Sequence, residues 1–413
     1  KANILINNID VVPFNLTYVN ALGETKPLNY TMKAEARFLR AYFYFEMVKR
    51  FGDIPWYDTE LFVSETDQLN KPRDSRELVM KNILEDLDFA ITNLSTTPSV
   101  YTVTKWTALS LKSRVCLFEG TFRKYHNLNL STNADFFLQE SITASRELMK
   151  ESNYTLYTEG GTNQAYRKLF TSQNAPTTEV IMARNYNLTY DIYNTVGTYH
   201  TSVGEGRPGV TRKIIASYLM NDGSRFTDNP NWETMTFVDE CKNRDPRLTQ
   251  TVFYHNSRWL RANVDVSEGG KDNNSIEPTQ EATRTKTGYY LKRHLAENEE
   301  DTRFGKTNFH SSIVSSWPVV RYADILLMYA EAQTEYLNKA QGASIINDEL
   351  VYKSIEMVRQ RAGLNLYTLK RGMSYDQLIK LIRNERRCEF AFEESRFWDI
   401  RRWKIANDVY SKP

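Results

Sequence analysis

The sequence predicts a mainly α-helical protein, in which tetratricopeptide-like helical hairpins form a scaffold with a large loop-rich insertion. Apolar residues recur at helical spacing in several segments near both ends of the chain. These segments resemble one another in pairs, which indicates a repeat of helical hairpins. The long stretch between them is rich in Thr, Asn, Tyr, Gly and Asp. We expect one domain over residues 1–413, with scaffold at 31–152 and 319–405 and the insertion at 153–318.

The clearest helical signal lies at residues 32–51, where apolar side chains recur every three or four positions. A second apolar row, formed by Leu39, Phe43 and Met47, predicts that this helix packs on more than one side. Gly52 permits a C-terminal cap, and Pro55 prevents the helix from continuing.

Residues 2–9 are predicted to be the end of a helix, and the rest of the scaffold follows the same helical period. One helix begins after residues 72–73, with Asp74 or Ser75 as its N-cap. The other predicted helices are Thr104–His126, Asp135–Glu151, Val320–Asn338, Asn347–Ala362 with Gly363 as its cap, and Tyr375–Trp403 as one helix or a broken pair.

The insertion contains only short regular elements in the sequence pattern. Val180–Ala183 and Thr249–Tyr254 have the composition of strands, and Arg212–Met220 predicts a brief helix. Loops held by a rigid frame often carry binding groups, so we expect the ligand-facing surface in this insertion.

Charge and composition exclude several classes of function. The chain has 53 Lys and Arg against 51 Asp and Glu, a balance that argues against binding of nucleic acid. No apolar run approaches the roughly 20 residues that span a bilayer. The five histidines lack ligand spacing, so no metal and no cofactor is predicted. Cys116, Cys241 and Cys388 form no CxxC motif and predict free thiols, buried at positions 116 and 388.

An acidic row in the last predicted helix has two interpretations. Glu385, Glu389 and Glu393 lie at i+4 spacing on one face and would repel each other without partners. We expect a structural ion-pair network with arginines nearby in the sequence and on other helices; the candidates are Arg321, Arg359, Arg361, Arg383, Arg386, Arg387, Arg396, Arg401 and Arg402. The alternative is the acid pair of a glycosidase.

Two further motifs give weaker signals. Gly204–Gly209 matches GxGxxG but follows no hydrophobic strand, and Pro208 removes a backbone donor, so we interpret it as a plain loop. Asp222–Asp228 is polar enough for Ca²⁺ but lacks the ligand spacing of an EF-hand.

Aromatic residues in polar loops are the candidate ligand-binding residues. Their rings can stack on the C–H faces of sugars while neighbouring amides and carboxylates bind hydroxyl groups. The alternative is that each ring pins its loop to the scaffold. The candidates are Trp56, Tyr190, Tyr193, Tyr199, Trp232 and Trp259, together with Asn187.

Several ordered motifs resemble the SusD/RagB family. They are AEARFLRAYFYF and FGDIPW at residues 34–56, YLMNDG at 218–223, NRDPRL at 243–248, TGYYLKR at 287–293, and ERRCEFAFE with RFWDIRRW at 385–403. Members of that family are surface glycan-binding lipoproteins of Bacteroidetes that act with a TonB-dependent transporter. They share no fixed ligand motif, so no ligand residue can be assigned by resemblance.

The resemblance implies non-catalytic capture of an oligosaccharide or polysaccharide and its delivery to a SusC-like transporter. It also implies a surface-exposed lipoprotein of the outer membrane, attached through a lipid anchor upstream of this sequence. Three alternatives remain: capture of peptides, as the RagB branch implies; an α-helical glycoside hydrolase with two carboxylates facing a cleft; and a scaffold that binds only proteins.

Overall fold

The computed structural model describes residues 1–196, 209–259, 262–265, 270, 287–295 and 313–411. The chain divides into two compact units, each assembled from separate segments. Unit 1 consists of Lys1–Asn153, Asp324–Ile346 and Ser395–Pro413, and unit 2 of Tyr154–Ala323 and Asn347–Glu394. Helices dominate the described residues, which confirms the predicted fold class. The single domain over residues 1–413 stays a prediction.

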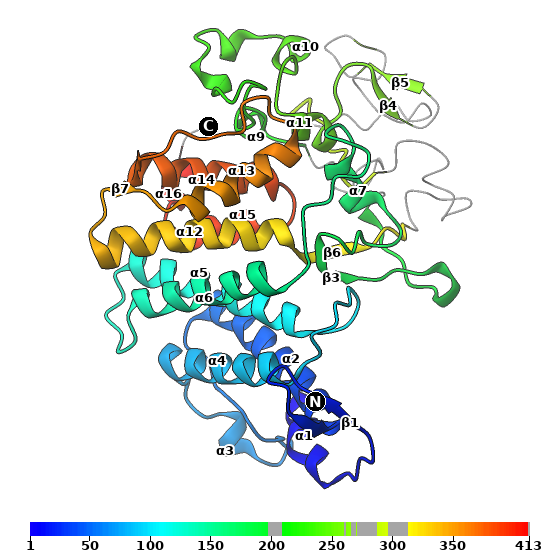
Figure 1. Ribbon diagram of the computed structural model, residues 1–413, viewed down its shortest axis with the longest axis vertical. Helices are drawn as coiled ribbons and strands as arrows, with labels where there is room; N and C mark the ends of the chain where they lie inside the picture. Colours follow the sequence, from blue (N-terminus) through cyan, green and yellow to red (C-terminus); the bar gives the residue numbers. More distant parts are fainter. Residues whose placement is uncertain (197–208, 260–261, 266–269, 271–286, 296–312, 412–413) are drawn as a thin grey trace. The chain divides into compact units, whose positions relative to one another are not determined.

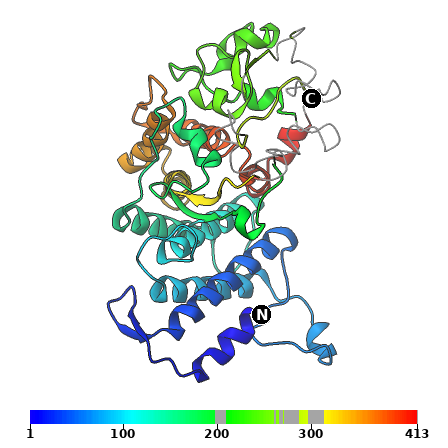
Figure 2. The ribbon, with the colours of Figure 1, turned by 90° about the vertical axis from the view of Figure 1, so that its right-hand side faces the viewer.

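Unit 1 is a stack of antiparallel helices, seen as blue and cyan layers in Figure 1 and from the side in Figure 2. Its elements are α1 (Ala2–Asn8), η1 (Ile9–Val11), β1 (Thr17–Val19), β2 (Thr25–Pro27), α2 (Asn29–Phe51), α3 (Thr66–Leu69), α4 (Arg76–Asn93), α5 (Lys105–His126), α6 (Ala134–Glu151), most of α12 (Tyr322–Gln341), β7 (Ile345–Ile346), α15 (Ser395–Arg402) and α16 (Ala406–Tyr410).

Two caps predicted from the sequence, Ser75 and Gly52, are present in these helices, and Thr104 adds a cap that the sequence pattern did not indicate. Ser75 accepts a hydrogen bond from Leu78 N at the start of α4, and Thr104 forms a capping box at the start of α5. Gly52 ends α2 with a φ of +74°. The predicted helical positions are therefore confirmed to within a few residues.

The outer row of α2 differs from the prediction. The side chains of Leu39 and Phe43 are 54% and 60% exposed, and only Met47 of this row is half-buried. The buried face of α2 carries Ala34, Phe38 and Phe45, and it already accounts for the contacts with α4 and α5. The expected burial of this row is therefore wrong for Leu39 and Phe43, although α2 does pack on more than one side, since it contacts α1, α4 and α5 through other residues.

Unit 2 combines short elements with two longer helices. Its elements are α7 (Ala165–Thr171), β3 (Val180–Arg184), η2 (Leu188–Tyr190), α9 (Arg212–Ile215), η3 (Phe226–Asp228), η4 (Trp232–Thr234), α10 (Phe237–Glu240), α11 (Pro246–Thr251), β4 (Ser257–Trp259), β5 (Ala262–Val264), β6 (Trp317–Arg321), α13 (Glu349–Ala362), β8 (Met373–Ser374) and α14 (Tyr375–Glu389). β3 and β6 pair antiparallel, as do β4 and β5.

Three local predictions in unit 2 are wrong. The run predicted as strand Thr249–Tyr254 begins inside α11, whose N-cap is Asp245 and whose first residue is Pro246. The helix expected at Arg212–Met220 ends at Ile215 and gives way to a turn. Val320 lies in β6, so the predicted helix starts two residues later, at α12.

The last predicted helix is a broken pair, which was one of the two forms expected. α14 ends at Glu389 and α15 begins at Ser395. Phe392 and Glu394, between them, have φ values of +63° and +61°. A right-handed helix cannot continue through residues in this left-handed conformation.

Candidate ligand-binding site

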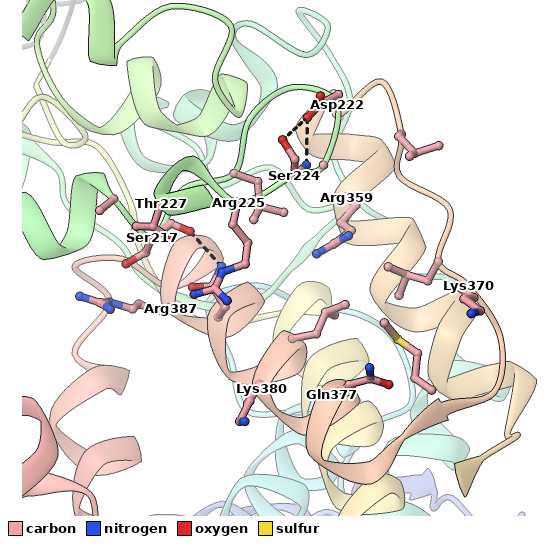
Figure 3. Close-up of a pocket in the computed structure, with 18 of the residues that line it drawn as sticks. Ser217, Asp222, Ser224, Arg225, Thr227, Arg359, Lys370, Gln377, Lys380 and Arg387 are labelled. Carbon is pink, nitrogen blue, oxygen red and sulfur yellow. Dashed lines mark hydrogen bonds between the residues drawn. The ribbon is translucent and has the colours of Figure 1, made fainter. Parts of the chain in front are cut away.

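Unit 2 contains a cavity of about 940 Å3, within the range of roughly 300–1,000 Å3 that is usual for small-molecule sites. Its lining comes from residues 213–232, which run from α9 to η4, from residues 366–373 after α13, and from one face of α14. α13 adds Arg359 (Figure 3). These stretches are far apart in the sequence, so only the fold brings them together.

A tight turn at residues 220–225 forms one wall of the cavity. Gly223 has a φ of +83°, in the left-handed region that favours glycine, and a Cβ at this position would lie 3.0 Å from the Leu366 carbonyl oxygen. Asp222 accepts hydrogen bonds from Ser224 N (2.9 Å) and Ser224 Oγ (2.6 Å). The carboxylate of Asp222 therefore caps its own turn, as Figure 3 shows.

Arg244 fastens the segment that leads into this turn. Its guanidinium is buried and donates hydrogen bonds to the carbonyl oxygens of Ile215 (2.6 Å) and Tyr218 (2.8 Å). It also lies 3.8 Å from the centre of the Phe226 ring. Burial lowers the pKa of Arg244. The NRDPRL motif thus has a structural role under the cavity wall.

Trp232 is half-buried and faces the cavity from η4. Its ring centre lies 6.2 Å from that of Phe226 in an edge-to-face arrangement and 5.6 Å from the Arg212 guanidinium. Arg212 also donates hydrogen bonds to the carbonyl oxygens of Trp232 (2.9 Å) and Glu233 (2.6 Å). The indole is therefore held in place before any ligand arrives.

One face of α14 forms the opposite wall. The helix starts with a capping box between Ser374 and Gln377. Gln377, Lys380, Asn384 and Arg387 follow at steps of three or four residues and line the cavity from one side of the helix. Asn384 Nδ2 donates to the Ser217 carbonyl oxygen (2.9 Å), which ties α14 to the segment after α9.

The predicted ion-pair network lies on the other side of α14. Glu389 accepts from Arg321 Nη1 (2.6 Å) and Arg247 Nη1 (2.7 Å) and also pairs with Arg361. Glu385 pairs with Arg359 (3.0 Å) and with Arg247 (2.7 Å). The network also takes in Glu393, which pairs with Arg321 (2.8 Å) and Arg293 (2.5 Å), and Glu179, which pairs with Arg321 (2.8 Å) and Arg361 (3.1 Å).

These carboxylates suit a structural role. Burial alone would raise the pKa of Glu389, but Arg361, Arg321 and Arg247 lower it well below its ordinary value. A carboxylate held ionised in this way is a poor general acid at neutral pH. The geometry therefore favours the structural interpretation of the acidic row over the glycosidase alternative.

Trp56 lies in unit 1 with its indole buried. Its ring centre is 4.2 Å from that of Tyr44 and 5.1 Å from the Arg40 guanidinium, and its backbone N donates to Asp74 (2.7 Å). This placement matches the alternative in which the ring pins its loop, and it leaves little of the ring for a ligand.

Tyr190 and Tyr193 are 73% and 41% exposed and lie outside the cavity lining. Asn187 accepts a hydrogen bond from Thr189 N (2.8 Å) and shapes the turn between them. Trp259 belongs to β4, where its backbone pairs with Ala262. Tyr199 and all but the last residue of the GxGxxG loop lie outside the described residues. Contact of a ligand with any of these residues stays a prediction.

Among the described residues, no three His, Cys, Asp or Glu side chains gather where they could hold a metal ion. The described helices include none with the length and apolar character needed to cross a bilayer. Cys116, Cys241 and Cys388 are free thiols, and those at positions 116 and 388 are buried, as predicted.

The cations of the cavity were not among the residues predicted to bind a ligand, whereas Trp232 was. Arg387 was assigned to the ion-pair network, and Arg225 and Lys380 were given no role. A signal was available, because Lys380, Asn384 and Arg387 follow the i, i+4, i+7 pattern on the face of the helix away from Glu385.

Two family models match this chain. One, described as the SusD family, matches residues 168–413. The other, described as starch-binding and associating with the outer membrane, matches residues 5–117. The matched residues fall in both units, and residues 118–167 lie in neither match.

Individual relatives agree with these matches. A SusD-like protein of Formosa agariphila is 24% identical over 99% of this chain and 71% of its own length. A SusD-like protein of Bacteroides fragilis has a crystal structure that matches with a TM-score of 0.68 and 28% identity, over 92% of this chain and 70% of its own. A chain crystallised with xylogluco-oligosaccharide matches with a TM-score of 0.65 and 21% identity, over 99% of this chain and 70% of its own.

Proposed function

Because this chain belongs to the SusD family, we propose that it binds oligosaccharides at the cell surface without cleaving them and passes them to a SusC-like TonB-dependent transporter. The same proposal places it at the outer membrane as a lipoprotein. Bound glycan would favour closure over the transporter through a higher affinity for the closed state.

The observation that carries this proposal is the cavity of unit 2 with the Trp232 ring in its wall. A fixed indole offers a flat apolar face for a sugar ring. In the opposite wall the Gln377 amide nitrogen and the Asn384 amide oxygen can bind hydroxyls, because the other amide atoms of these residues already bind Ser374 and the Ser217 carbonyl oxygen. One relative of this fold was crystallised with an oligosaccharide, so the architecture is compatible with such a ligand.

The ion-pair network supports the non-catalytic part of the proposal. Glu385, Glu389 and Glu393 are each bound by arginines, and Glu389 is kept ionised. A glycosidase needs one carboxyl group that stays protonated and a second that faces it across a cleft. Incubation of the purified chain with a reducing-end-labelled oligosaccharide is expected to return it unchanged, and a shortened product would contradict the proposal.

The site is tested by affinity electrophoresis through gels that each contain one polysaccharide, with wild type, Trp232→Ala and Trp259→Ala. In the gel that retards the wild type, we expect Trp232→Ala to bind about 5- to 30-fold more weakly, because loss of the stacking ring removes about 1–2 kcal/mol. The matched control is Phe62→Ala, which removes an exposed aromatic ring in unit 1.

Trp56→Ala completes the series and separates two kinds of loss. Because the Trp56 ring is buried, we expect this variant to unfold at a lower temperature, with binding of the folded fraction unchanged. Equal retention of wild type, Trp232→Ala and Trp259→Ala would show that the assigned site is wrong. Retention by no gel would count against glycan capture itself.

A further inference from the structure

The cavity of unit 2 is lined by an excess of positive charge. Among the described lining residues six are cations and Asp222 is the one carboxylate; the cations are Lys213, Arg225, Arg359, Lys370, Lys380 and Arg387. The chain as a whole is nearly balanced, with a net charge of +2. This local excess therefore distinguishes the cavity from the rest of the molecule.

Four of these cations have no carboxylate partner within the described part of the chain. Arg359 is paired with Glu385 at 3.0 Å and belongs to the network. Arg225, Lys370, Lys380 and Arg387 form no ion pair with any described residue, and the Asp222 carboxylate is occupied by Ser224. Their charges are thus available to a ligand. These four are called the cavity cations below.

Arg387 is the most desolvated of the cavity cations. Its side chain is partly buried, and its Nε has no hydrogen-bond partner among the described residues. Burial lowers the pKa of Arg387, as expected for a cation that no nearby carboxylate compensates. A desolvated and unpaired guanidinium destabilises a fold unless a ligand completes it.

The cavity cations are spread along the cavity instead of meeting at one point. Figure 3 shows Arg387 at one end of the view and Lys370 at the other, with Arg225 and Arg359 between them. Leu366, Leu369, Met373 and the Trp232 ring add apolar surface to the same lining. Such an arrangement suits a chain of sugar rings with anionic groups at intervals more than a single small anion.

We propose that this cavity takes an anionic oligosaccharide, whose carboxylate or sulfate groups pair with Arg225, Lys370, Lys380 and Arg387 while a sugar ring stacks on Trp232. This inference rests on the proposed function and narrows its cargo from glycans in general to acidic glycans. Arginine supplies a planar pair of donors that matches a carboxylate or sulfate, and lysine adds a point charge.

The test uses two matched pairs of oligosaccharides in isothermal titration calorimetry. An oligogalacturonide is compared with its fully methyl-esterified form, and a sulfated galactan oligosaccharide with its chemically desulfated form. The two pairs distinguish carboxylate from sulfate as the recognised group. A hexaglutamate peptide is titrated in parallel, and each titration is run at low and at high NaCl concentration.

The test protein is the double variant that carries both Lys380→Gln and Arg387→Gln. The control is Lys353→Gln. Lys353 is exposed on α13 outside the cavity, so the control removes a charge from the same unit without touching the lining. We expect wild type to bind one anionic oligosaccharide at least about tenfold more tightly than the neutral form of the same oligosaccharide. The double variant should bind the anionic form about 10- to 100-fold more weakly than wild type does, because charged hydrogen bonds are lost. High salt should weaken the same complex by screening.

Each other outcome overturns the inference in a distinguishable way. In one such outcome, wild type binds the anionic and neutral forms of an oligosaccharide equally, with the same affinity in the double variant and a lower one in Trp232→Ala. That result would support glycan capture and reject an acidic cargo. Binding of hexaglutamate without binding of any oligosaccharide would replace glycan capture by peptide capture. Binding of none of the five ligands would reject both the proposed function and this inference. Circular dichroism of each variant checks that it is folded.

Discussion

The two sides of α14 differ in whether their charged side chains form ion pairs. On one side Glu385 and Glu389 are buried, and each is bound by arginines within 3.0 Å. On the other side Lys380 is exposed and Arg387 partly buried, and neither has a carboxylate partner among the described residues. The same fifteen-residue helix therefore separates a network of paired charges from a cavity wall whose cations have no described carboxylate partner.

This contrast separates charges that hold the fold from charges left for a partner. Removing one member of a buried ion pair leaves its partners charged, desolvated and uncompensated, and this strongly destabilises the fold. A cation that lines an open cavity leaves no buried partner uncompensated when it is removed. Its removal should therefore lower the affinity for a ligand and not the stability of the fold. Stability measurements on the two sides of one helix therefore test the distinction directly.

The largest effect is expected from Glu389→Gln. Glu389 is fully buried and bound by Arg247, Arg321 and Arg361, so its loss leaves three buried guanidinium groups with a missing partner. We expect the free energy of unfolding to fall by about 3–5 kcal/mol. Urea unfolding at pH 7, followed by circular dichroism, measures the change.

Glu394→Gln is the matched control, because Glu394 is an exposed carboxylate five residues away. Its free energy of unfolding should stay within about 0.5 kcal/mol of the wild type. If both variants unfolded at the urea concentration of the wild type, the network would not be what holds unit 2 together, and the contrast across α14 would fail.

Protonation of Glu389 at low pH should lower the free energy of unfolding gradually, and by less than the substitution Glu389→Gln does. The pKa of Glu389 is held far below its ordinary value in the folded chain, by Arg361, Arg321 and Arg247 against the opposing effect of burial. Its stabilisation is therefore complete above the unfolded pKa of about 4.3 and is lost as the pH falls below that value, by about 1.4 kcal/mol per pH unit.

The pH series compares wild type with Glu389→Gln in urea unfolding from pH 7 to pH 3. The variant lacks this carboxylate, so the difference in unfolding free energy between the two proteins should narrow below about pH 4.3. Glu394→Gln should follow the wild type throughout. A difference that stayed constant down to pH 3 would mean that Glu389 is not held ionised.

The sequence predicted the scaffold well because helices are local. The period of apolar residues located α2, α4, α5, α6 and α13, and cap residues such as Ser75 and Gly363 marked their ends. The acidic row at Glu385 and Glu389 was interpreted correctly, because i+4 carboxylates on one helix require cations nearby.

Elements that depend on competing local signals were predicted less well. The β-branched and aromatic residues near Thr251 favoured a strand, whereas Asp245 as N-cap with Pro246 in the first turn started α11. A helix signal was therefore present in the motif NRDPRL, but the prediction did not use it. The row at Leu39 and Phe43 shows the converse, since apolar spacing alone does not say whether a neighbour covers it.

The cavity could not be predicted, because its lining residues lie up to about 170 positions apart and meet only in the folded chain. Loop context selected both Trp56 and Trp232, although one indole is buried and the other faces the cavity. Sequence gives the chemical character of such a residue, but the neighbours that decide its exposure come from tertiary packing.

The smallest effect is expected from Arg387→Gln, on the cavity side of α14. The guanidinium is partly desolvated, its Nε lacks a hydrogen-bond partner in the described residues, and it shares the cavity with Arg225 and Lys380. Neutralising it should therefore leave the free energy of unfolding unchanged or raise it by up to about 1 kcal/mol, as is common for residues kept for function at the expense of stability. Urea unfolding beside Lys353→Gln, expected within about 0.5 kcal/mol of wild type, measures the difference. A fall in the free energy of unfolding of more than about 1 kcal/mol would mean that Arg387 stabilises the fold. The two sides of α14 would then not differ in the role of their charges.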